Sequence, residues 1–358
     1  MSSAPFPRLR GSVSAPSSSG CGNLRPQHSL ALGWTRSSAR AFGASARRRR
    51  ALRASAHRVR GCDLDGPGLR SARPLIVSLG SVHAVPIESG VAELLADADR
   101  PGGWLLLIDR IRQSYVDLDD PTYLDFEYLR SMADIVDALP PGPLAVVHVG
   151  GGGCTFARYV AATRPGSSQV VLEPDAALIE LVRARLPLPR GARIRVRLQS
   201  GRDGVLGMRA GSADVVVVDA YLGGRIPGEL MTREFFADLA RVLRPDGVLL
   251  ANLTDGPPLT YTRRVVATAR TVLPRVLLTG STGVLGKRRY GNIVLAASRA
   301  RLPLRAVRQA AASATFPTRV IADRALDALV GADLEPLTDA APMRSPRPPE
   351  EGWRVAED

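Results

Sequence analysis

Four consecutive glycines, Gly150 to Gly153, follow a run of apolar residues and stand directly before a segment with helical spacing. Glycine accepts positive φ values and lets a ligand approach the main chain, and a helix start offers unpaired N–H groups. The next apolar run ends at Glu173. A carboxylate there can accept hydrogen bonds from both hydroxyls of a ribose. Bare main chain and an acid at two neighbouring strand ends therefore predict a nucleoside site.

A dinucleotide would use a similar turn, but its G-x-G-x-x-G pattern is absent. Counted from Gly150 or from Gly151, the third glycine position holds Thr155 or Phe156. Neither residue is small enough to let the helix close onto the strand as the dinucleotide motif requires. We therefore expect a nucleoside without a pyrophosphate. The alternative is a glycine-rich turn that binds nothing.

Asp219 stands at the end of a further apolar run, 213–220. Ligands of an open parallel sheet bind at the carboxyl ends of its strands, so we predict a functional role for Asp219 rather than simple capping of the loop that follows. A carboxylate beside an ammonium group can bind the cation and accept its proton, which produces a nucleophilic amine. Asp219 is thus the predicted catalytic residue.

Seven strand-like runs would position these residues: 144–150, 169–174, 193–198, 213–220, 247–253, 275–281 and 291–298. Helical patterns lie between them at 154–163, 176–185, 203–208, 230–243 and 259–273. Several runs are apolar without alternation, so both faces of the sheet must be covered. The last two are joined by a short loop and should pair antiparallel at the sheet edge. The sequence predicts an α/β fold, a Rossmann-like seven-stranded, mostly parallel sheet with helices on both faces.

The chain divides by composition and pattern into five parts. Two strands joined by the turn "DADRPGG", then a helix, form a small β-hairpin region ahead of the break "PPGP". The predicted parts are a disordered Arg/Ser-rich leader (1–73), the hairpin and helix (74–140), a nucleoside-binding transferase domain (141–300), a helical appendage (301–340) and a disordered tail (341–358).

The leader holds fourteen arginines against Asp63 and Asp65, so it carries nearly all of the net charge of +14. Such a segment suits a transit peptide or a nucleic-acid arm. However, Lys287 is the only lysine of the chain. That bias is typical of GC-rich genomes, where spurious upstream reading frames have this composition, and we favour an untranslated segment. Nucleic acid is therefore not an expected partner.

Cysteine usage and hydropathy exclude other classes. Cys21, Cys62 and Cys154 are too few and too scattered for a disulfide framework or a metal cluster, and we expect no metal. No apolar run reaches the roughly 18 residues that span a bilayer. We expect a soluble, cytoplasmic protein that has no membrane partner.

The segment "VVHVGGGGCTFARYV…QVVLEPD" resembles the first two motifs of class I S-adenosylmethionine-dependent transferases. More narrowly, residues 87 to 300 resemble the spermidine synthase (polyamine aminopropyltransferase) family. The likeness rests on the hairpin "LLLIDRIRQSYVDLDDPTYLDFEY" and on the order Asp219, Pro227, "LMTREFF" and "LRPDG".

The resemblance implies roles for individual residues. Glu173 would hold the ribose, and Asp219 would deprotonate the attacking amine. The nucleoside pocket would be formed by Gln113, Gly150, Gly151, Gly152, Gly153 and Ser200, and the acceptor would contact Tyr115 and Tyr221. The implied co-substrate is S-adenosylmethionine or decarboxylated S-adenosylmethionine, the implied acceptor a small molecule such as a polyamine, and the implied assembly a homodimer.

Three family acids are missing from this chain. Gly153, Ser200 and Leu222 stand where the family usually carries aspartates in the glycine loop, beside the adenine and after the fourth strand. A dication would lose much of its attraction to such a pocket. Three functions stay open: aminopropyl transfer, methyl transfer to a non-polyamine substrate, and nucleoside binding without catalysis.

Other chemically capable residues are predicted to be structural. His148 lies inside a buried strand, and Cys154 is interpreted as a small packing residue despite its place at a helix start. Tyr115, Tyr123 and Tyr128 could line a pocket, but on amphipathic segments such residues more often belong to the core.

Overall fold

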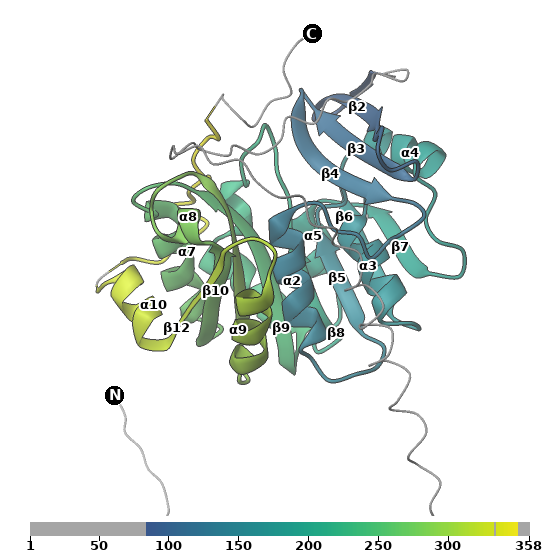
Figure 1. Cartoon of the computed structure of the whole chain (residues 1–358). Coiled ribbons are helices and arrows are strands. Elements are labelled where there is room, and N and C mark those ends of the chain that lie inside the picture. Colours follow the sequence, from purple (N-terminus) through teal and green to yellow (C-terminus); the bar gives the residue numbers. More distant parts are fainter. Residues whose placement is uncertain (1–83, 333, 350–358) are drawn as a thin grey trace, which may run out of the picture. The chain divides into compact units, whose positions relative to one another are not determined.

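Five parallel strands form the larger part of a mixed sheet. The computed structural model describes residues 84–332 and 334–349, so the predicted leader lies outside the described residues. In this part of the chain the sheet has eight strands. They run in the spatial order β12 (Thr318–Ala322), β10 (Arg275–Ser281), β11 (Gly291–Ser298), β9 (Leu243–Asp255), β8 (Ala213–Val218), β5 (Ala145–Val149), β6 (Ser168–Glu173) and β7 (Arg193–Leu198) (Figure 1).

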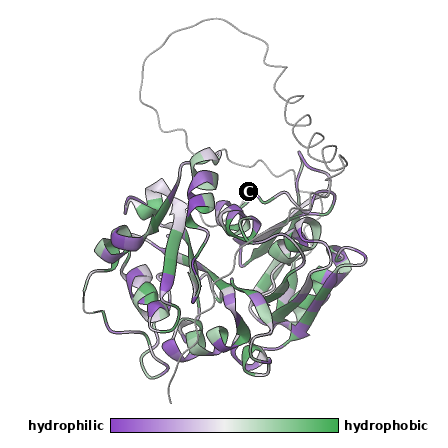
Figure 2. Cartoon of the chain, turned by 90° about the horizontal axis from the view of Figure 1, so that it is seen from below, coloured by the Kyte–Doolittle hydropathy of each residue, from purple (hydrophilic) through white to green (hydrophobic). Residues whose placement is uncertain are grey.

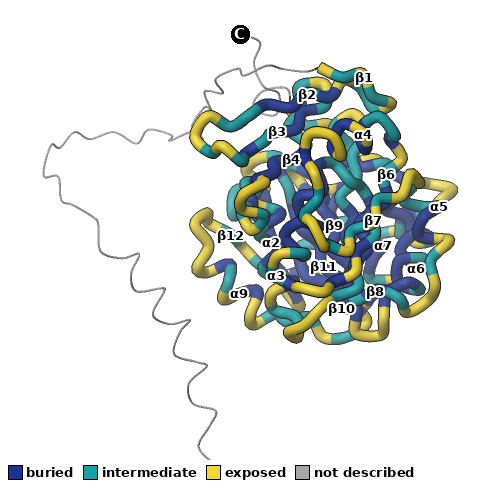
Figure 3. Tube along the Cα trace, turned by 90° about the vertical axis from the view of Figure 1, so that its right-hand side faces the viewer, coloured by how far each residue is buried: buried dark blue, intermediate teal, exposed yellow. Residues whose placement is uncertain are grey.

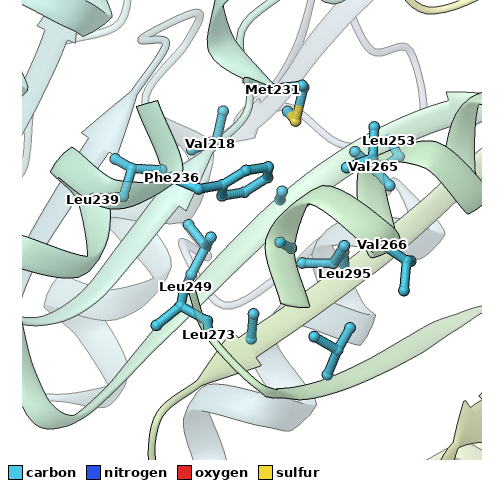
Figure 4. Close-up of a cluster of buried hydrophobic side chains, with 14 of the residues drawn as sticks. Val218, Met231, Phe236, Leu239, Leu249, Leu253, Val265, Val266, Leu273 and Leu295 are labelled. Carbon is cyan, nitrogen blue, oxygen red and sulfur yellow. The ribbon is translucent and has the colours of Figure 1, made fainter. Parts of the chain in front are cut away.

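Helices cover both faces of this sheet, as the apolar strands predicted. One face packs against α2 (Glu127–Asp137), α3 (Thr155–Thr163) and α9 (Leu304–Ser313). The other packs against α5 (Gly201–Leu206), α6 (Arg233–Val242), α7 (Thr260–Arg270) and α10 (Asp323–Val330). Hydrophobic residues follow the strands in Figure 2, and the central strands are buried in Figure 3. Figure 4 shows part of the second face, where Phe236, Leu249 and Leu295 are fully buried. The predicted α/β fold class is confirmed.

The hairpin region is a four-stranded antiparallel sheet rather than two strands. It consists of β1 (Val85–Ile87), β2 (Gly90–Ala96), β3 (Gly103–Ile108) and β4 (Ile111–Asp117). The run that we took as one strand breaks at Asp109 and Arg110, whose φ angles are 48° and 62°. Two consecutive positive φ values are typical of a tight hairpin turn. Because this turn contains no glycine, the sequence gives little indication of it.

This small sheet packs on α4 (Ala176–Arg185) through buried residues that include Leu106, Leu178 and Leu186. A polar contact fixes the same junction. Oδ2 of Asp175 accepts hydrogen bonds from Ser89 N (2.9 Å) and Ser89 Oγ (2.8 Å), and Oδ1 accepts from Leu178 N at 3.0 Å. Asp175 therefore caps α4 and ties it to the turn between β1 and β2.

The region 301–340 is not entirely helical. Its segment Thr318–Ala322 forms β12 between α9 and α10, and pairs antiparallel with β10. The antiparallel pair of β10 and β11 is present as predicted, but β12 rather than this pair forms the sheet edge. Val320 and Ile321 are β-branched residues, which suit a strand. The short helical pattern around them concealed this signal.

Part of the predicted disordered tail is folded against the body of the protein. Ser345 is fully buried. Its Oγ accepts a hydrogen bond from Ile226 N at 2.9 Å, and its carbonyl oxygen accepts one from Arg225 Nε at 2.6 Å. Composition predicted disorder because the tail has little apolar area of its own, but these hydrogen bonds come from another segment.

Within the described residues, no helix combines the length and apolar character needed to cross a bilayer.

Replacing Asp175 by Ala should lower the free energy of unfolding by about 1–2 kcal/mol at neutral pH, since it removes a helix cap. Burial acts to raise the pKa of Asp175, but hydrogen bonds from Leu178 and Ser89 outweigh it and hold the pKa below the ordinary value. A carboxyl whose pKa is lower in the folded state stabilises above its unfolded pKa, and this stabilisation disappears as the pH falls through the folded pKa. Urea unfolding should therefore show that the difference in the free energy of unfolding between wild type and variant becomes smaller at acid pH.

The control for this measurement is Asp99→Ala. Asp99 is exposed in the turn between β2 and β3, and its carboxylate accepts no hydrogen bond among the described residues. Its replacement should leave stability nearly unchanged. Equal losses for the two variants would contradict the proposed capping role of Asp175.

Candidate functional site

A cavity of about 780 Å³ lies at the carboxyl ends of β5, β6 and β8. It is lined by Gly150, Gly151, Gly152, Glu173 and Ser200, and also by Gln113, Tyr128, Asp219, Tyr221 and Asn252. Neighbouring strands of a parallel sheet end at the same edge, which is why residues far apart in the sequence meet here. The cavity is thus shared by the predicted nucleoside residues and the predicted catalytic acid.

The bare main chain of the glycine turn makes room for other parts of the protein. Gly150 has a φ of 98°, and a Cβ atom there would lie 2.1 Å from the carbonyl oxygen of Asp219. Gly152 has a φ of 45°, and its Cβ would lie 2.6 Å from Ser114 Oγ. We expected the glycines to admit a ligand. The structure shows that Gly150 admits the end of β8, which brings Asp219 against the turn.

The N–H groups of the turn already have partners. Gly151 N donates to Glu173 Oε2 at 2.8 Å, and Gly153 N donates to Ser114 Oγ at 3.0 Å. Gly153 does not line the cavity, unlike the three glycines before it. With these N–H groups occupied, the turn is a poor anion site, which agrees with a nucleoside that has no pyrophosphate.

Glu173 lies against the glycine turn, as the sequence predicted. In addition to Gly151 N, its carboxylate accepts a hydrogen bond from Asp175 N at 3.1 Å through Oε1. Burial raises the pKa of Glu173, although these main-chain donors counteract the effect. An ionised carboxylate can accept about four hydrogen bonds. Glu173 therefore keeps acceptor capacity for hydroxyl groups of a ligand.

Asp219 is held by two side chains from different elements. Tyr128 Oη on α2 donates to Asp219 Oδ2 at 3.0 Å, and Asn252 Nδ2 on β9 donates to Oδ1 at 2.9 Å. Burial raises the pKa of Asp219, while these two donors act in the opposite direction. A carboxyl whose pKa is moved toward the working pH is well suited to accept a proton.

Sequence reasoning assigned neither Tyr128 nor Asn252 to the site. The helical spacing of Tyr128 suggested a core residue, and the sequence cannot tell which turn of a helix faces a cavity. Asn252 did give a signal, because it is a polar residue in the otherwise apolar run 247–253. Tyr221 was predicted to contact the acceptor. It lines the cavity, and its hydroxyl donates to the carbonyl oxygen of Asn252 at 3.2 Å.

Gln113 and Tyr115 were expected in the same pocket, but only Gln113 lines it. Tyr115 Oη donates to Asp97 Oδ2 at 2.6 Å, and its ring packs edge-on against Tyr123. The assignment of Tyr115 to the acceptor site is therefore wrong. The cause is a β-bulge. Ser114 pairs with Leu106 and Arg112 with Leu107, so Gln113 is left unpaired and the alternation of side chains is broken.

Ser200 lines the cavity but is engaged in capping. Its Oγ accepts a hydrogen bond from Asp203 N at 3.1 Å and donates to Asp203 Oδ2 at 2.8 Å. It begins α5 in this way, as expected of a serine at an N-cap. The hydroxyl is therefore available to a nucleoside only as an additional acceptor.

His148 and Cys154 have the structural character that the sequence predicted. His148 is buried beside Gln169, and burial lowers its pKa to about 4, so the ring is neutral. Burial raises the pKa of the Cys154 thiol to about 11. A protonated, buried thiol is unreactive. The described residues contain no group of three or more His, Cys, Asp or Glu side chains that could hold a metal ion.

The chain was compared with known proteins. No family model matches it. A polyamine aminopropyltransferase of Chromobacterium violaceum is 34% identical over 145 residues, which cover 40% of this chain and 55% of that protein. One of Pyrobaculum calidifontis is 31% identical over 185 residues, which cover 49% of this chain and 62% of that protein. The chain therefore matches somewhat more than half the length of these curated relatives.

Solved structures extend the likeness. The crystal structure of a probable spermidine synthase from Corynebacterium glutamicum superimposes with a TM-score of 0.68 at 29% identity, and covers 73% of this chain and 97% of that one. Spermidine synthase from Thermotoga maritima has a TM-score of 0.50 at 16% identity, which shows a shared fold alone. The chain is thus similar to spermidine synthases in sequence and fold, in agreement with the resemblance of its sequence.

Replacing Gly150 by Ala should destabilise the protein more than the same change at Gly142. Both residues have positive φ angles, 98° and 121°, but a Cβ on Gly142 would have no atom within 4 Å. Both variants should lose about 1–2 kcal/mol from backbone strain. Gly150→Ala should lose a further 1–3 kcal/mol, roughly, because the end of β8 must shift. Urea unfolding measures both, and equal losses would show that the approach of Asp219 to the turn is unimportant for stability.

Proposed function

We propose that this chain is a transferase that binds decarboxylated S-adenosylmethionine or S-adenosylmethionine and passes an alkyl group, in the first instance aminopropyl, to an amine. One observation carries the proposal. A single cavity combines a glycine turn and the ribose-type carboxylate of Glu173 with the buried, doubly hydrogen-bonded carboxylate of Asp219. The relatives named polyamine aminopropyltransferase support the same activity.

The nucleoside would be held by Gln113, by Gly150 to Gly152, by Glu173 and by Ser200, all of which line the cavity. Glu173 would accept hydrogen bonds from the ribose hydroxyls. Gly153 is omitted from this set, because it does not line the cavity and its N–H group donates to Ser114. A nucleoside without a phosphate group fits a turn whose N–H groups are already paired better than a phosphate would.

The donor supplies a carbon atom that is activated by a positively charged sulfur. The protein must add position and a proton acceptor. The amine nitrogen forms a bond to this carbon while the carbon–sulfur bond breaks, and the bonding electrons stay on sulfur to give a neutral thioether. The extra proton on nitrogen passes to Asp219. Tyr128 and Asn252 fix the carboxylate for this transfer.

The acceptor side of the cavity differs from what a polyamine would favour. Leu222, where the family carries a second acid, lines the cavity and is 55% exposed. Glu173 and Asp175 also line it, but both are engaged with main-chain N–H groups, whereas Glu88 and Glu229 are exposed acids on its wall. The apolar Leu222 in place of that second acid favours a second candidate function, methyl transfer to a non-polyamine substrate. Nucleoside binding without catalysis is the third.

Asp219→Asn should lower the turnover number by about 10²- to 10⁴-fold, because the amide has the same shape but cannot accept the proton. Binding of methylthioadenosine, measured by calorimetry, should change little. The thioether product is quantified by chromatography. Asp246→Asn, an exposed residue at the opposite end of β9, is the control. Unchanged turnover in Asp219→Asn would refute the catalytic role.

The reaction rate should fall as the pH is lowered, because the carboxylate of Asp219 becomes protonated. Burial raises the pKa of this carboxyl. The protonated form cannot accept a proton, so activity is lost as the pH falls through the raised pKa. The acid limb of kcat should therefore lie above the ordinary aspartate pKa of 3.8 and vanish in Asp219→Asn. An acid limb at or below the ordinary value would count against Asp219 as the base.

Calorimetric titration with S-adenosylmethionine, its decarboxylated form and methylthioadenosine separates the three functions. Preference for the decarboxylated form indicates aminopropyl transfer, and preference for S-adenosylmethionine indicates methyl transfer. Binding of any of them without turnover on amines indicates the third function. Absence of binding to all three would refute the nucleoside site itself.

A further inference from the structure

Behind Asp219 lies a pair of asparagine side chains on neighbouring strands. Asn252 Nδ2 on β9 donates to Asp219 Oδ1 at 2.9 Å, and Asn292 Nδ2 on β11 donates to Asn252 Oδ1 at 3.0 Å. Asn252 is 2% exposed. Asn292 lies opposite Thr254 in the antiparallel pairing of β9 and β11, diagonal to Asn252. The side chains of Asn292, Asn252 and Asp219 thus form a chain of two hydrogen bonds that ends at the predicted base.

The direction of the Asn252 amide matters because its two ends are chemically opposite. The NH₂ group donates hydrogen bonds and the oxygen accepts them, although both have nearly the same shape. Reversing the amide would place its oxygen against the Asp219 carboxylate and its NH₂ group against that of Asn292. The contact with Asp219 would then be unfavourable in a buried site, and so would the contact with Asn292 as long as Asn292 keeps its own NH₂ group toward Asn252. The carboxylate of Asp219 therefore fixes the orientation, and the NH₂ group of Asn292 supports it.

We propose that Asn292 is a positioning residue for the transfer reaction, which acts by holding the Asn252 amide with its NH₂ group toward Asp219. This inference rests on the proposed function, in which Asp219 is the base. It adds that a residue of β11, a strand outside the glycine turn, controls the hydrogen bond that the predicted catalytic carboxylate receives. Asn292 itself also lines the cavity, next to Asn252.

The groups that face Asp219 make it dependent on this pair. Tyr128 on α2 donates to it, and Tyr221, in the segment after β8, lies near enough to interact with it electrostatically. Burial raises the pKa of both tyrosines well above the ordinary value, so both stay protonated. From β9 and β11 the facing groups are the neutral amides. No cation acts on Asp219 among the described residues. Its ionised form is therefore stabilised by neutral donors.

The test uses Asn292→Asp, which replaces the donor by an acceptor. The carboxylates of Asp219 and of the new Asp side chain then compete for the NH₂ group of Asn252, so Asp219 should lose part of this donor. The acid limb of kcat should move upward by about one pH unit or more, equivalent to a roughly tenfold loss of rate at a pH within the limb. The KM for the nucleoside donor should change little. Asn252→Leu, which removes the donor directly, should shift the limb in the same direction.

The double variant Asn252→Leu/Asn292→Asp distinguishes the effect of the Asn252 amide orientation from the effect of the added charge. Asn292→Asp also adds a negative charge, which by itself would raise the pKa of Asp219. In the background of Asn252→Leu there is no amide to reverse, so the second change should add little if the amide is the mediator. A full additional shift would overturn the proposal in favour of simple charge repulsion. Asn292→Leu removes the donor without adding charge and should give a smaller upward shift of the acid limb of kcat. This variant tests the proposal even if Asn292→Asp fails to fold.

A readout independent of activity keeps this inference distinct from the proposed function. The titration of Asp219 can be followed by carboxyl carbon NMR, with its signal assigned by comparison with Asp219→Asn. An upward shift in Asn292→Asp and Asn292→Leu supports the positioning role, even if the wild type transfers no group, in which case only the proposed function fails. A titration of Asp219 that neither variant moves would overturn the positioning role.

Discussion

The site depends on how closely two strand ends approach each other. A side chain on Gly150 would collide with the carbonyl oxygen of Asp219, so the glycine is the condition under which the end of β8 can lie against the turn after β5. This contact places a carboxylate from one strand beside the main chain of another. Glu173, from the third strand end, completes the arrangement through its hydrogen bond to Gly151. The cavity follows from this convergence.

Buried carboxylates need internal donors, and the two in this site obtain them differently. Main-chain N–H groups support Glu173, and these move only with the backbone. Side chains from α2 and β9 support Asp219, and these can be exchanged or reoriented. The first arrangement suits a residue that only binds, because its environment is constant. The second suits a residue whose protonation must be tuned.

Segments outside the five parallel strands and their helices also contact the site and the loops around it. The N-terminal sheet supplies Gln113 through a β-bulge and Ser114 as partner of Gly153. The C-terminal segment fixes the loop after β8 through Ser345, which bonds Arg225 and Ile226. The likeness to the Corynebacterium structure covers 97% of that chain, so it extends beyond the parallel strands.

The sequence alone determined the parallel strands, the helices between them, and the meeting of the glycine turn, Glu173 and Asp219 at one edge. Apolar runs and strand ends are local patterns, and the geometry of a parallel sheet converts them into proximity. Only the tertiary structure decided that Tyr128 and Asn252 hold Asp219. It also directed Tyr115 away from the cavity, because a single unpaired residue in β4 reverses which side chains face it. Such outcomes depend on contacts between distant segments, and no local pattern of residues encodes which of their atoms will meet.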